Sequence, residues 1–201
     1  WGAANVGAGG AVIDTNGFSI GIGQSLLDGG GGGGLTKNGA GVLTLSGSNG
    51  YTGSTAVNGG ELVGTSTGAL PGWNVSGAIS VAAGAGLGVQ LGGVGVSEAD
   101  FVTMLGNGDF DAGSRIVVGT ANGSTSFSAD FGAATNAGTN VGLIKMSPND
   151  LTIDPTAQTF TGGMEIREGW VALDHAGNHV LGNAAISGGG GLRVQGSGNT
   201  T

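Results

Sequence analysis

Two histidines stand four residues apart in the segment Asp174-His-Ala-Gly-Asn-His179, and on a helix this spacing suits a pair of zinc ligands. Gly177 and Asn178 lie between the two imidazoles, and both residue types favour a turn over a helix. No third ligand stands nearby in the sequence. We therefore interpret His175 and His179 as part of an exposed turn, and we expect no zinc site.

Two carboxylates lie close together in Asn107-Gly-Asp-Phe-Asp111, and carboxylate oxygens are the ligands that calcium prefers. The segment lacks the distal glutamate of an EF-hand loop, and it also lacks the Gly-Gly-x-Gly-x-Asp repeat of calcium-binding β-rolls. Asp109 and Asp111 are therefore weak candidates for a calcium site. We expect no resident metal and no cofactor.

Six consecutive glycines, residues 29–34, resemble a phosphate-binding loop in composition alone. A Walker loop requires Gly-Lys-Ser or Gly-Lys-Thr at its end, whereas Leu35 and Thr36 precede Lys37 here. The sequence thus indicates a flexible or tightly wound turn.

Acidic side chains are numerous but scattered, with thirteen acidic residues against five basic ones and a net charge of -8. Glycoside hydrolysis needs two carboxylates at a fixed separation, and a lyase needs a base beside a charge-neutralising partner. We expect no catalysis, and a polysaccharide-degrading enzyme is kept as an alternative. The small number of basic residues also argues against nucleic-acid binding.

The stretch from Leu35 to Leu62 shows how the chain is built, because it reads as three short strands separated by glycine turns. Val42 and Thr44 alternate with Leu43 and Leu45 at the period of a strand, so the two leucines are expected to face inward. Glycine and asparagine tolerate positive φ, so the chain can turn sharply between strands.

This stretch recurs about 108 residues later, so the repeat copies cover about 35–64 and 143–173. The matching residues are Leu35, Lys37, Leu43 and Leu45 with Leu143, Lys145, Leu151 and Ile153, then Tyr51, Val57, Gly60 and Leu62 with Phe160, Ile166, Gly169 and Val171. Self-similar strand-turn units are typical of solenoids, in which each unit buries its apolar side against its neighbours. The matching positions of the two lysines indicate a structural role at a turn.

Lys37-Asn-Gly-Ala-Gly-Val-Leu-Thr-Leu-Ser-Gly-Ser-Asn-Gly-Tyr-Thr-Gly-Ser-Thr-Ala-Val-Asn-Gly-Gly-Glu-Leu62 resembles the autotransporter-associated β-strand repeat. The second copy is degenerate, because Ser147-Pro-Asn149 replaces the glycines of the first. The resemblance implies an all-β, right-handed parallel β-helix from the passenger region of a secreted or surface-exposed bacterial protein. It implies no catalytic residues, because the motif of the family is structural.

The amino-acid composition limits the remaining possibilities for the class of protein. Forty-nine glycines suggest low complexity, but a hydrophobic fraction of 38% and alternating aliphatic runs argue against disorder. Cysteine is absent, so no disulfide holds the fold. No run of about 18 apolar residues occurs, and we expect no membrane insertion of this segment. We interpret residues 1–201 as a single β-solenoid segment of a longer protein.

Residues 97–105 form the one helix that we expect. Ser97 can cap it, Glu98 and Asp100 favour its positive end, and Gly106 would end it. Its apolar face indicates that it plugs or flanks the core.

The function that we expect is that of a non-enzymatic structural or display module: a stalk, an adhesin-like part or a filament-forming solenoid. Its expected partners are neighbouring repeats or other copies of the chain, stacked end to end. Binding of extracellular glycans is the alternative, with Trp73 and Trp170 as weak candidate residues. Trp73 follows a proline turn and favours core packing, whereas Trp170 replaces Glu61 of the first copy and is the better exposed candidate.

Overall fold

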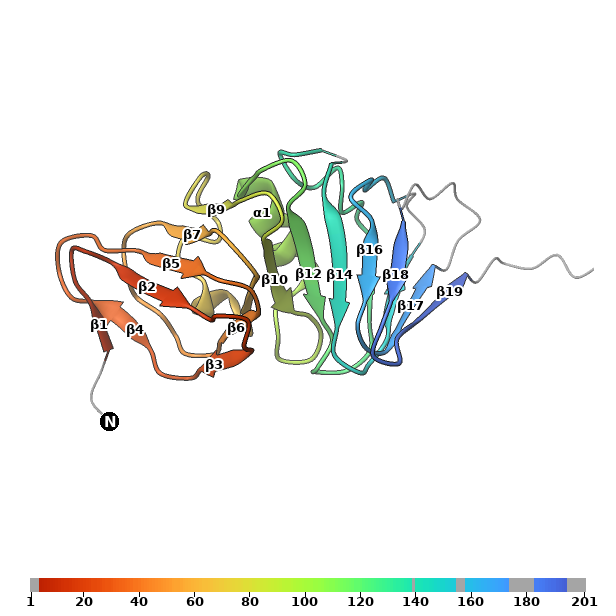
Figure 1. Ribbon diagram of the computed structural model, residues 1–201, viewed down its shortest axis with the longest axis horizontal. Coiled ribbons are helices and arrows are strands. Elements are labelled where there is room, and N and C mark those ends of the chain that lie inside the picture. Colours follow the sequence, from red (N-terminus) through yellow and green to blue (C-terminus); the bar gives the residue numbers. More distant parts are fainter. Residues whose placement is uncertain (1–3, 139, 155–157, 174–182, 195–201) are drawn as a thin grey trace, which may run out of the picture.

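The computed structural model describes residues 4–138, 140–154, 158–173 and 183–194, and these residues form a stack of parallel strands with one helix at its side (Figure 1). The strands are β1 (Ala4–Val6), β2 (Ala11–Asp14), β3 (Ile20–Ile22), β4 (Leu26–Asp28), β5 (Leu35–Asn38), β6 (Val42–Leu45), β7 (Thr55–Val57), β8 (Glu61–Gly64), β9 (Ile79–Val81), β10 (Gly86–Gln90), β11 (Asp109–Phe110), β12 (Arg115–Gly119), β13 (Thr125–Phe127), β14 (Gly142–Met146), β15 (Leu151–Ile153), β16 (Met164–Ile166), β17 (Trp170–Leu173), β18 (Ala184–Ile186) and β19 (Gly191–Val194).

Every ladder between these strands is parallel, which confirms the predicted β-helix. The longest sheet has eight strands in the order β18-β16-β14-β12-β10-β8-β6-β3. A five-stranded sheet, β11-β9-β7-β5-β2, lies against its N-terminal part. A four-stranded sheet, β13-β15-β17-β19, accompanies its C-terminal part, and β1 pairs with β4.

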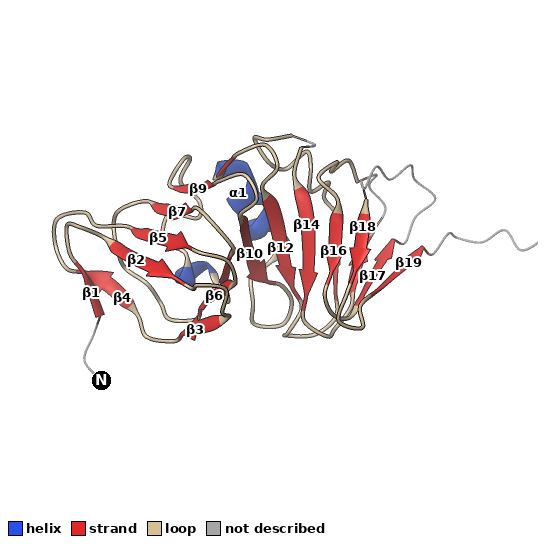
Figure 2. Cartoon of the chain, viewed as in Figure 1, coloured by secondary structure: helices blue, strands red, loops and turns tan. Residues whose placement is uncertain are grey.

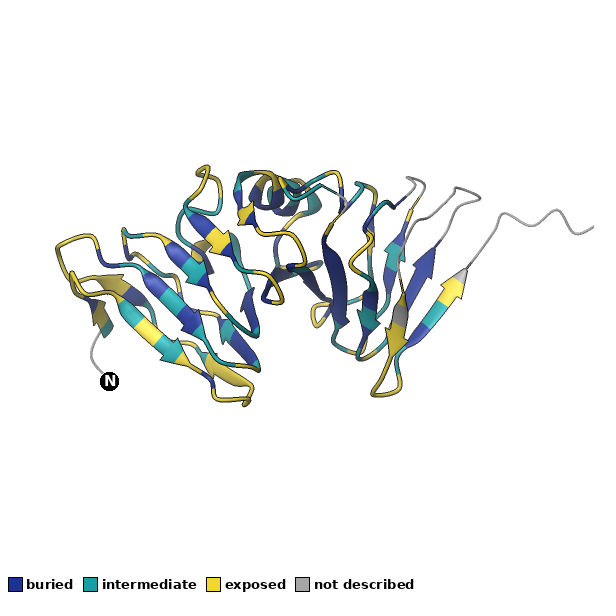
Figure 3. Cartoon of the chain, turned by 45° about the horizontal axis from the view of Figure 1, so that its top comes forward, coloured by how far each residue is buried: buried dark blue, intermediate teal, exposed yellow. Residues whose placement is uncertain are grey.

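The registers place like residues above one another from coil to coil. Leu43 pairs with Leu62, Leu62 with Leu87, Leu87 with Ile116, and Ile116 with Leu143. All five side chains are at most 1% exposed, so they form one aliphatic column inside the solenoid. Buried residues line the space between the sheets, and the turns at its edges are exposed (Figure 3). The inward orientation predicted for Leu43 and Leu45 is confirmed.

The eight-stranded sheet changes its role along the chain. In the first repeat copy β5 and β7 belong to the five-stranded sheet and β6 and β8 to the eight-stranded one. In the second copy the equivalents of β5 and β7, which are β14 and β16, belong to the eight-stranded sheet. One long sheet therefore serves as the second wall of the early coils and the first wall of the later ones. The strands change direction between these halves (Figure 1).

Helix α1 (Glu98–Asn107) lies beside the place where this change occurs (Figure 2). Ser97 caps it by accepting a hydrogen bond from the amide of Asp100, as predicted. The predicted end at Gly106 is wrong, since the helix continues to Asn107 before Gly108 caps it. Phe101 packs edge-on against Phe127, with their ring centroids 5.9 Å apart, so the helix covers the core as expected.

The predicted number of strands in the first repeat copy is wrong. The first repeat copy contains four strands and not three, because Leu35–Asn38 pairs with Ala11–Asp14 and with Thr55–Val57. In the stretch 124–131, the strand β13 covers only Thr125–Phe127. A short 3-10 helix, Thr67–Ala69, follows the first copy.

Candidate functional site

The eight-stranded sheet bends sharply at β10, so that the two halves of its outer face approach each other. Gly86 and Gly88 occupy the positions of this strand whose side chains would project from that face. A Cβ on Gly86 would lie 2.8 Å from Cγ2 of Val117, and a Cβ on Gly88 would lie 2.5 Å from Cβ of Val117 and closer still to its carbonyl group. The two glycines therefore allow β8 and β12 to approach across β10.

A small apolar cluster forms on the concave side of this bend, outside the main core. It consists of Val42, Val63, Val117 and Ile144, all at most 9% exposed, with Met146 packed against them. These residues come from strands β6, β8, β12 and β14. Burial of an aliphatic side chain contributes about 1.5–3 kcal/mol, so the cluster stabilises the folded shape of the sheet.

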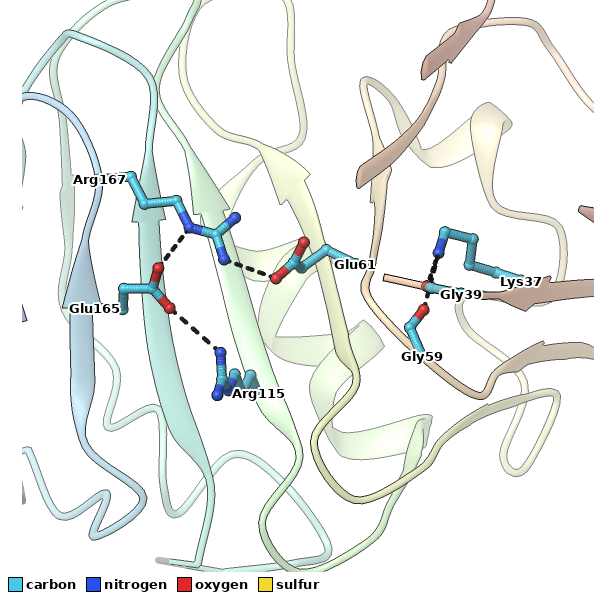
Figure 4. A network of polar contacts seen from close by, with 7 residues as sticks. All are labelled: Lys37, Gly39, Gly59, Glu61, Arg115, Glu165 and Arg167. Carbon is cyan, nitrogen blue, oxygen red and sulfur yellow. Dashed lines mark hydrogen bonds and ion pairs between the residues drawn. The ribbon is translucent and has the colours of Figure 1, made fainter. Parts of the chain in front are cut away.

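An ion-pair network spans the same face (Figure 4). Nη2 of Arg167 lies 2.8 Å from Oε1 of Glu61, and Nε of Arg167 lies 2.8 Å from Oε1 of Glu165. Nη1 of Arg115 lies 3.3 Å from Oε2 of Glu165. Glu61 begins β8 and Arg167 follows β16, and these strands would lie about 19 Å apart in a flat sheet. The contact between Glu61 and Arg167 is thus a direct consequence of the bend in the sheet.

The pKa values of Glu165 and Arg167, which form the central ion pair, are both shifted. The hydrogen bond from Arg167 lowers the pKa of Glu165, although burial opposes this, and the charges of Arg167 and Arg115 lower it further. Burial lowers the pKa of Arg167, but the hydrogen bonds to Glu61 and Glu165 outweigh it and hold the pKa above its ordinary value. Both shifts favour the charged forms of Glu165 and Arg167.

Each repeat copy buries a lysine whose ammonium group binds the turns of two coils. Nζ of Lys37 donates to the carbonyls of Asn38, Gly39 and Gly59 at 2.8–2.9 Å. Nζ of Lys145 donates to the equivalent three carbonyls, those of Met146, Ser147 and Glu168, at 2.6–3.1 Å. Both side chains are 0% exposed. This geometry supports the structural turn role that we predicted for the two lysines.

Burial also changes the proton affinity of the lysines. It lowers the pKa of Lys145 to about 8, while the nearby charges of Asp150 and Glu168 oppose the shift. Burial lowers the pKa of Lys37 as well, against the charges of Glu61 and Asp14. The cause is desolvation, because an ammonium group loses its water when it is enclosed.

The turn held by Lys145 keeps the backbone of the first copy with a different residue. Gly39 has φ of 72°, and its counterpart Ser147 has φ of 78°. A serine in this region is strained, because its Cβ crowds the backbone there. The degenerate second copy therefore preserves the turn and adds a hydroxyl group to its surface.

A groove of about 540 Å³ opens on the folded face between the two repeat copies. Residues of the first copy, Val42 and Thr44, form one side of it. Ser147 and Arg167 of the second copy belong to the other side, and Gln90 of β10 also lines it. We take this groove, together with the ion-pair network, as the candidate functional site.

The predicted calcium candidates lie elsewhere. Both Asp109 and Asp111 are exposed, and Oδ1 of Asp109 accepts a hydrogen bond of 2.9 Å from the side-chain amide of Asn136. In the described ranges, no group of three histidine, cysteine or acidic side chains is placed to hold a metal ion. His175 and His179 lie outside the described residues.

The two tryptophans also lie away from the groove. Trp73 is partly buried and packs against the main core, as its proline turn suggested. Trp170 is 42% exposed, but the guanidinium carbon of Arg193 lies over its ring, 5.0 Å from the centroid. Arg193 thus occupies one face of the ring that a sugar would need.

Sequence reasoning did not find the network or the groove. Glu61, Arg115, Glu165 and Arg167 have no motif in common, and two of them are 106 residues apart. One sequence signal was present, since alternating glycines in Gly86-Leu-Gly88 remove the side chains from one face of a strand.

Comparison with known protein families gives one match, in which residues 35–63 fit the family described as the passenger-associated-transport-repeat. Comparison with curated proteins and with solved structures gives no match. The matched segment is the first repeat copy, and two of its strands, β6 and β8, belong to the parallel eight-stranded sheet that continues into the second copy. The chain is thus a parallel β-solenoid whose first repeat copy matches the passenger-associated-transport-repeat, and the two findings together support a passenger-type β-helix repeat.

Proposed function

We propose that the chain is a non-enzymatic structural module of a bacterial passenger, in which the solenoid acts as a stiff stalk or display element. The main support is the pair of buried lysines, each of which joins the turns of successive coils through three carbonyl groups. These bonds add to the coil-to-coil backbone ladders. The two buried lysines thus hold successive coils together.

The charged groups of the ion-pair network support a structural role over an enzymatic one. A general acid requires a carboxyl group with a raised pKa, whereas the pKa of Glu165 is lowered. Glu61 and Glu165 share Arg167, so both carboxylates are engaged in ion pairs. This arrangement suits the clasp of a folded sheet better than hydrolysis of a glycan.

The passenger-type repeat supports a secreted or cell-surface location. Across the described ranges, no helix has the length and apolar character needed to cross a membrane. We propose the bacterial cell surface as the place where the module works.

We further propose that modules of this kind stack end to end, and the first coil carries the support. Strands β2 and β3 are edge strands of their sheets, and edge strands offer unpaired backbone groups to another chain. Val12 and Phe18 on this coil are 65% and 68% exposed. A neighbouring coil or a second copy of the chain would cover these side chains.

Light scattering of the purified chain over a concentration series, with electron micrographs of the same samples, tests the stacking. We expect mass to rise with concentration and short filaments to appear. The double variant Val12→Lys/Phe18→Lys should reduce the rise, whereas the control Ser80→Lys, on the exposed face of β9, should not. A wild-type chain that stays monomeric at every concentration would refute stacking.

A further inference from the structure

We propose that the groove between the repeat copies is a binding site for a neutral, hydroxyl-rich ligand, namely a short oligosaccharide. The site goes beyond the structural role proposed above, which stands whether or not the groove binds a ligand. Its volume of about 540 Å³ lies within the range of small-molecule sites, about 300–1,000 Å³.

The polar groups of the groove suit hydroxyl groups. Thr44 and Ser147 contribute hydroxyls, which can donate and accept hydrogen bonds. Arg167 is held by Glu61 and Glu165, and its Nη1 group has no acceptor among the described residues. A guanidinium fixed in this way is a preorganised donor that a pair of neighbouring hydroxyls can accept from.

The apolar groups of the groove suit the C–H face of a sugar ring. Ile20, Val42 and Met146 line the groove, and Ile20 is 39% exposed. A site that combines an aliphatic wall with a few placed polar groups is the usual form of a small-molecule site.

The charges of the groove argue against an anionic ligand. The two carboxylates that hold Arg167 neutralise its charge, and Glu168 adds an exposed carboxylate to the lining. An acidic sugar would meet this carboxylate and a chain of net charge -8. A neutral ligand avoids the repulsion.

The backbone conformation of Ser147 supports a binding role of the groove independently of the composition of its lining. The matching residue in the first copy is glycine with the same backbone conformation, so glycine would fit the turn without strain. Strained residues of this kind cluster at functional sites. Ser147 is one of the residues that line the groove.

Amide chemical shifts of the whole 201-residue chain, titrated with cellobiose, maltose and chitobiose, test the proposal. At least one of these neutral probes should give saturable shifts at Gly21, Thr44 and Ser147, with a Kd on the order of 1 mM. Digalacturonic acid, the anionic probe, should bind more weakly.

Two variants separate binding from folding. Ser147→Gly restores the residue of the first copy and should keep the thermal midpoint, yet weaken binding about fivefold. Thr44→Val removes the other hydroxyl with little change of shape and should weaken binding to a similar extent. Ser80→Ala, on an exposed face away from the groove, is the control. The proposal is overturned if no neutral probe saturates, if both variants bind like the wild type, or if digalacturonic acid binds most tightly.

Discussion

Replacement of Gly88 by alanine should open the fold of the long sheet and destabilise the chain. The added Cβ would lie 2.5 Å from Cβ of Val117 and would overlap the carbonyl group of that residue. The carbonyl belongs to backbone in a paired strand, so it cannot move aside without disturbing the ladder. Overpacking of this kind costs about 1–3 kcal/mol.

Two other contributions to the free energy of unfolding oppose each other. Alanine restricts the unfolded chain and thereby returns about 0.4–1 kcal/mol. Separation of the sheet faces would also expose the apolar cluster around Val63 and Val117. We therefore expect a net loss of about 1–3 kcal/mol, or roughly 2–12 °C in Tm for a chain of this size.

Urea unfolding followed by circular dichroism measures the loss, and Gly9→Ala is the matched control. A Cβ on Gly9 meets no atom within 4 Å. This variant should therefore lie between no change and a gain of about 1 kcal/mol. If Gly88→Ala were as stable as Gly9→Ala, the close approach across β10 would be refuted.

Three further variants test the core, the buried lysine and the ion pair. Leu43→Asp should lower the free energy of unfolding by several kcal/mol in urea melts, because the new carboxylate would be buried without a partner at a position where the side chain is 0% exposed. Ser80→Asp is the exposed control, and equal midpoints for the two variants would contradict the inward orientation of Leu43. The pKa of Lys145 is about 8 in the folded chain against 10.5 in the unfolded chain, so between these values the unfolded chain binds more protons and stability rises with pH. Relative to Lys145→Met, the wild type should gain about 3 kcal/mol from pH 8 to pH 10.5 in urea melts, and a constant difference would count against the burial of the ammonium group. A double-mutant cycle of Glu61→Gln and Arg167→Met should show a coupling of about 0.5–3 kcal/mol, and a coupling near zero would mean that the two residues do not meet.

The coils and their core were predictable from the sequence, because their determinants are local. The alternation of Leu43 and Leu45 with Val42 and Thr44 gives the inward face. Tyr51 and Phe160, which match between the two copies, are 2% and 0% exposed. The equivalence of Lys37 and Lys145 pointed to a turn in the same way. Such features repeat, so one copy informs the other.

The fold of the long sheet was not predictable by these means. It depends on contacts between residues far apart in the chain, such as Glu61 and Arg167, and no periodic pattern links them. The exchange of roles between sheets also begins in the stretch between the repeat copies, where α1 is inserted. Only the paired glycines of β10 gave a hint, and glycine is too frequent in this chain for such a hint to stand out.

The contact between the two halves of the outer face can be observed directly by methyl NOE spectroscopy. Val63 and Val117 lie on strands separated by β10, and in a flat sheet their methyl groups would be about 10 Å apart, beyond the reach of an NOE. The apolar cluster places Val42 and Val63 together with Val117 and Ile144. The folded sheet predicts NOEs between a methyl of the first pair and a methyl of the second. Complete absence of such NOEs, with those inside the main core present, would contradict it.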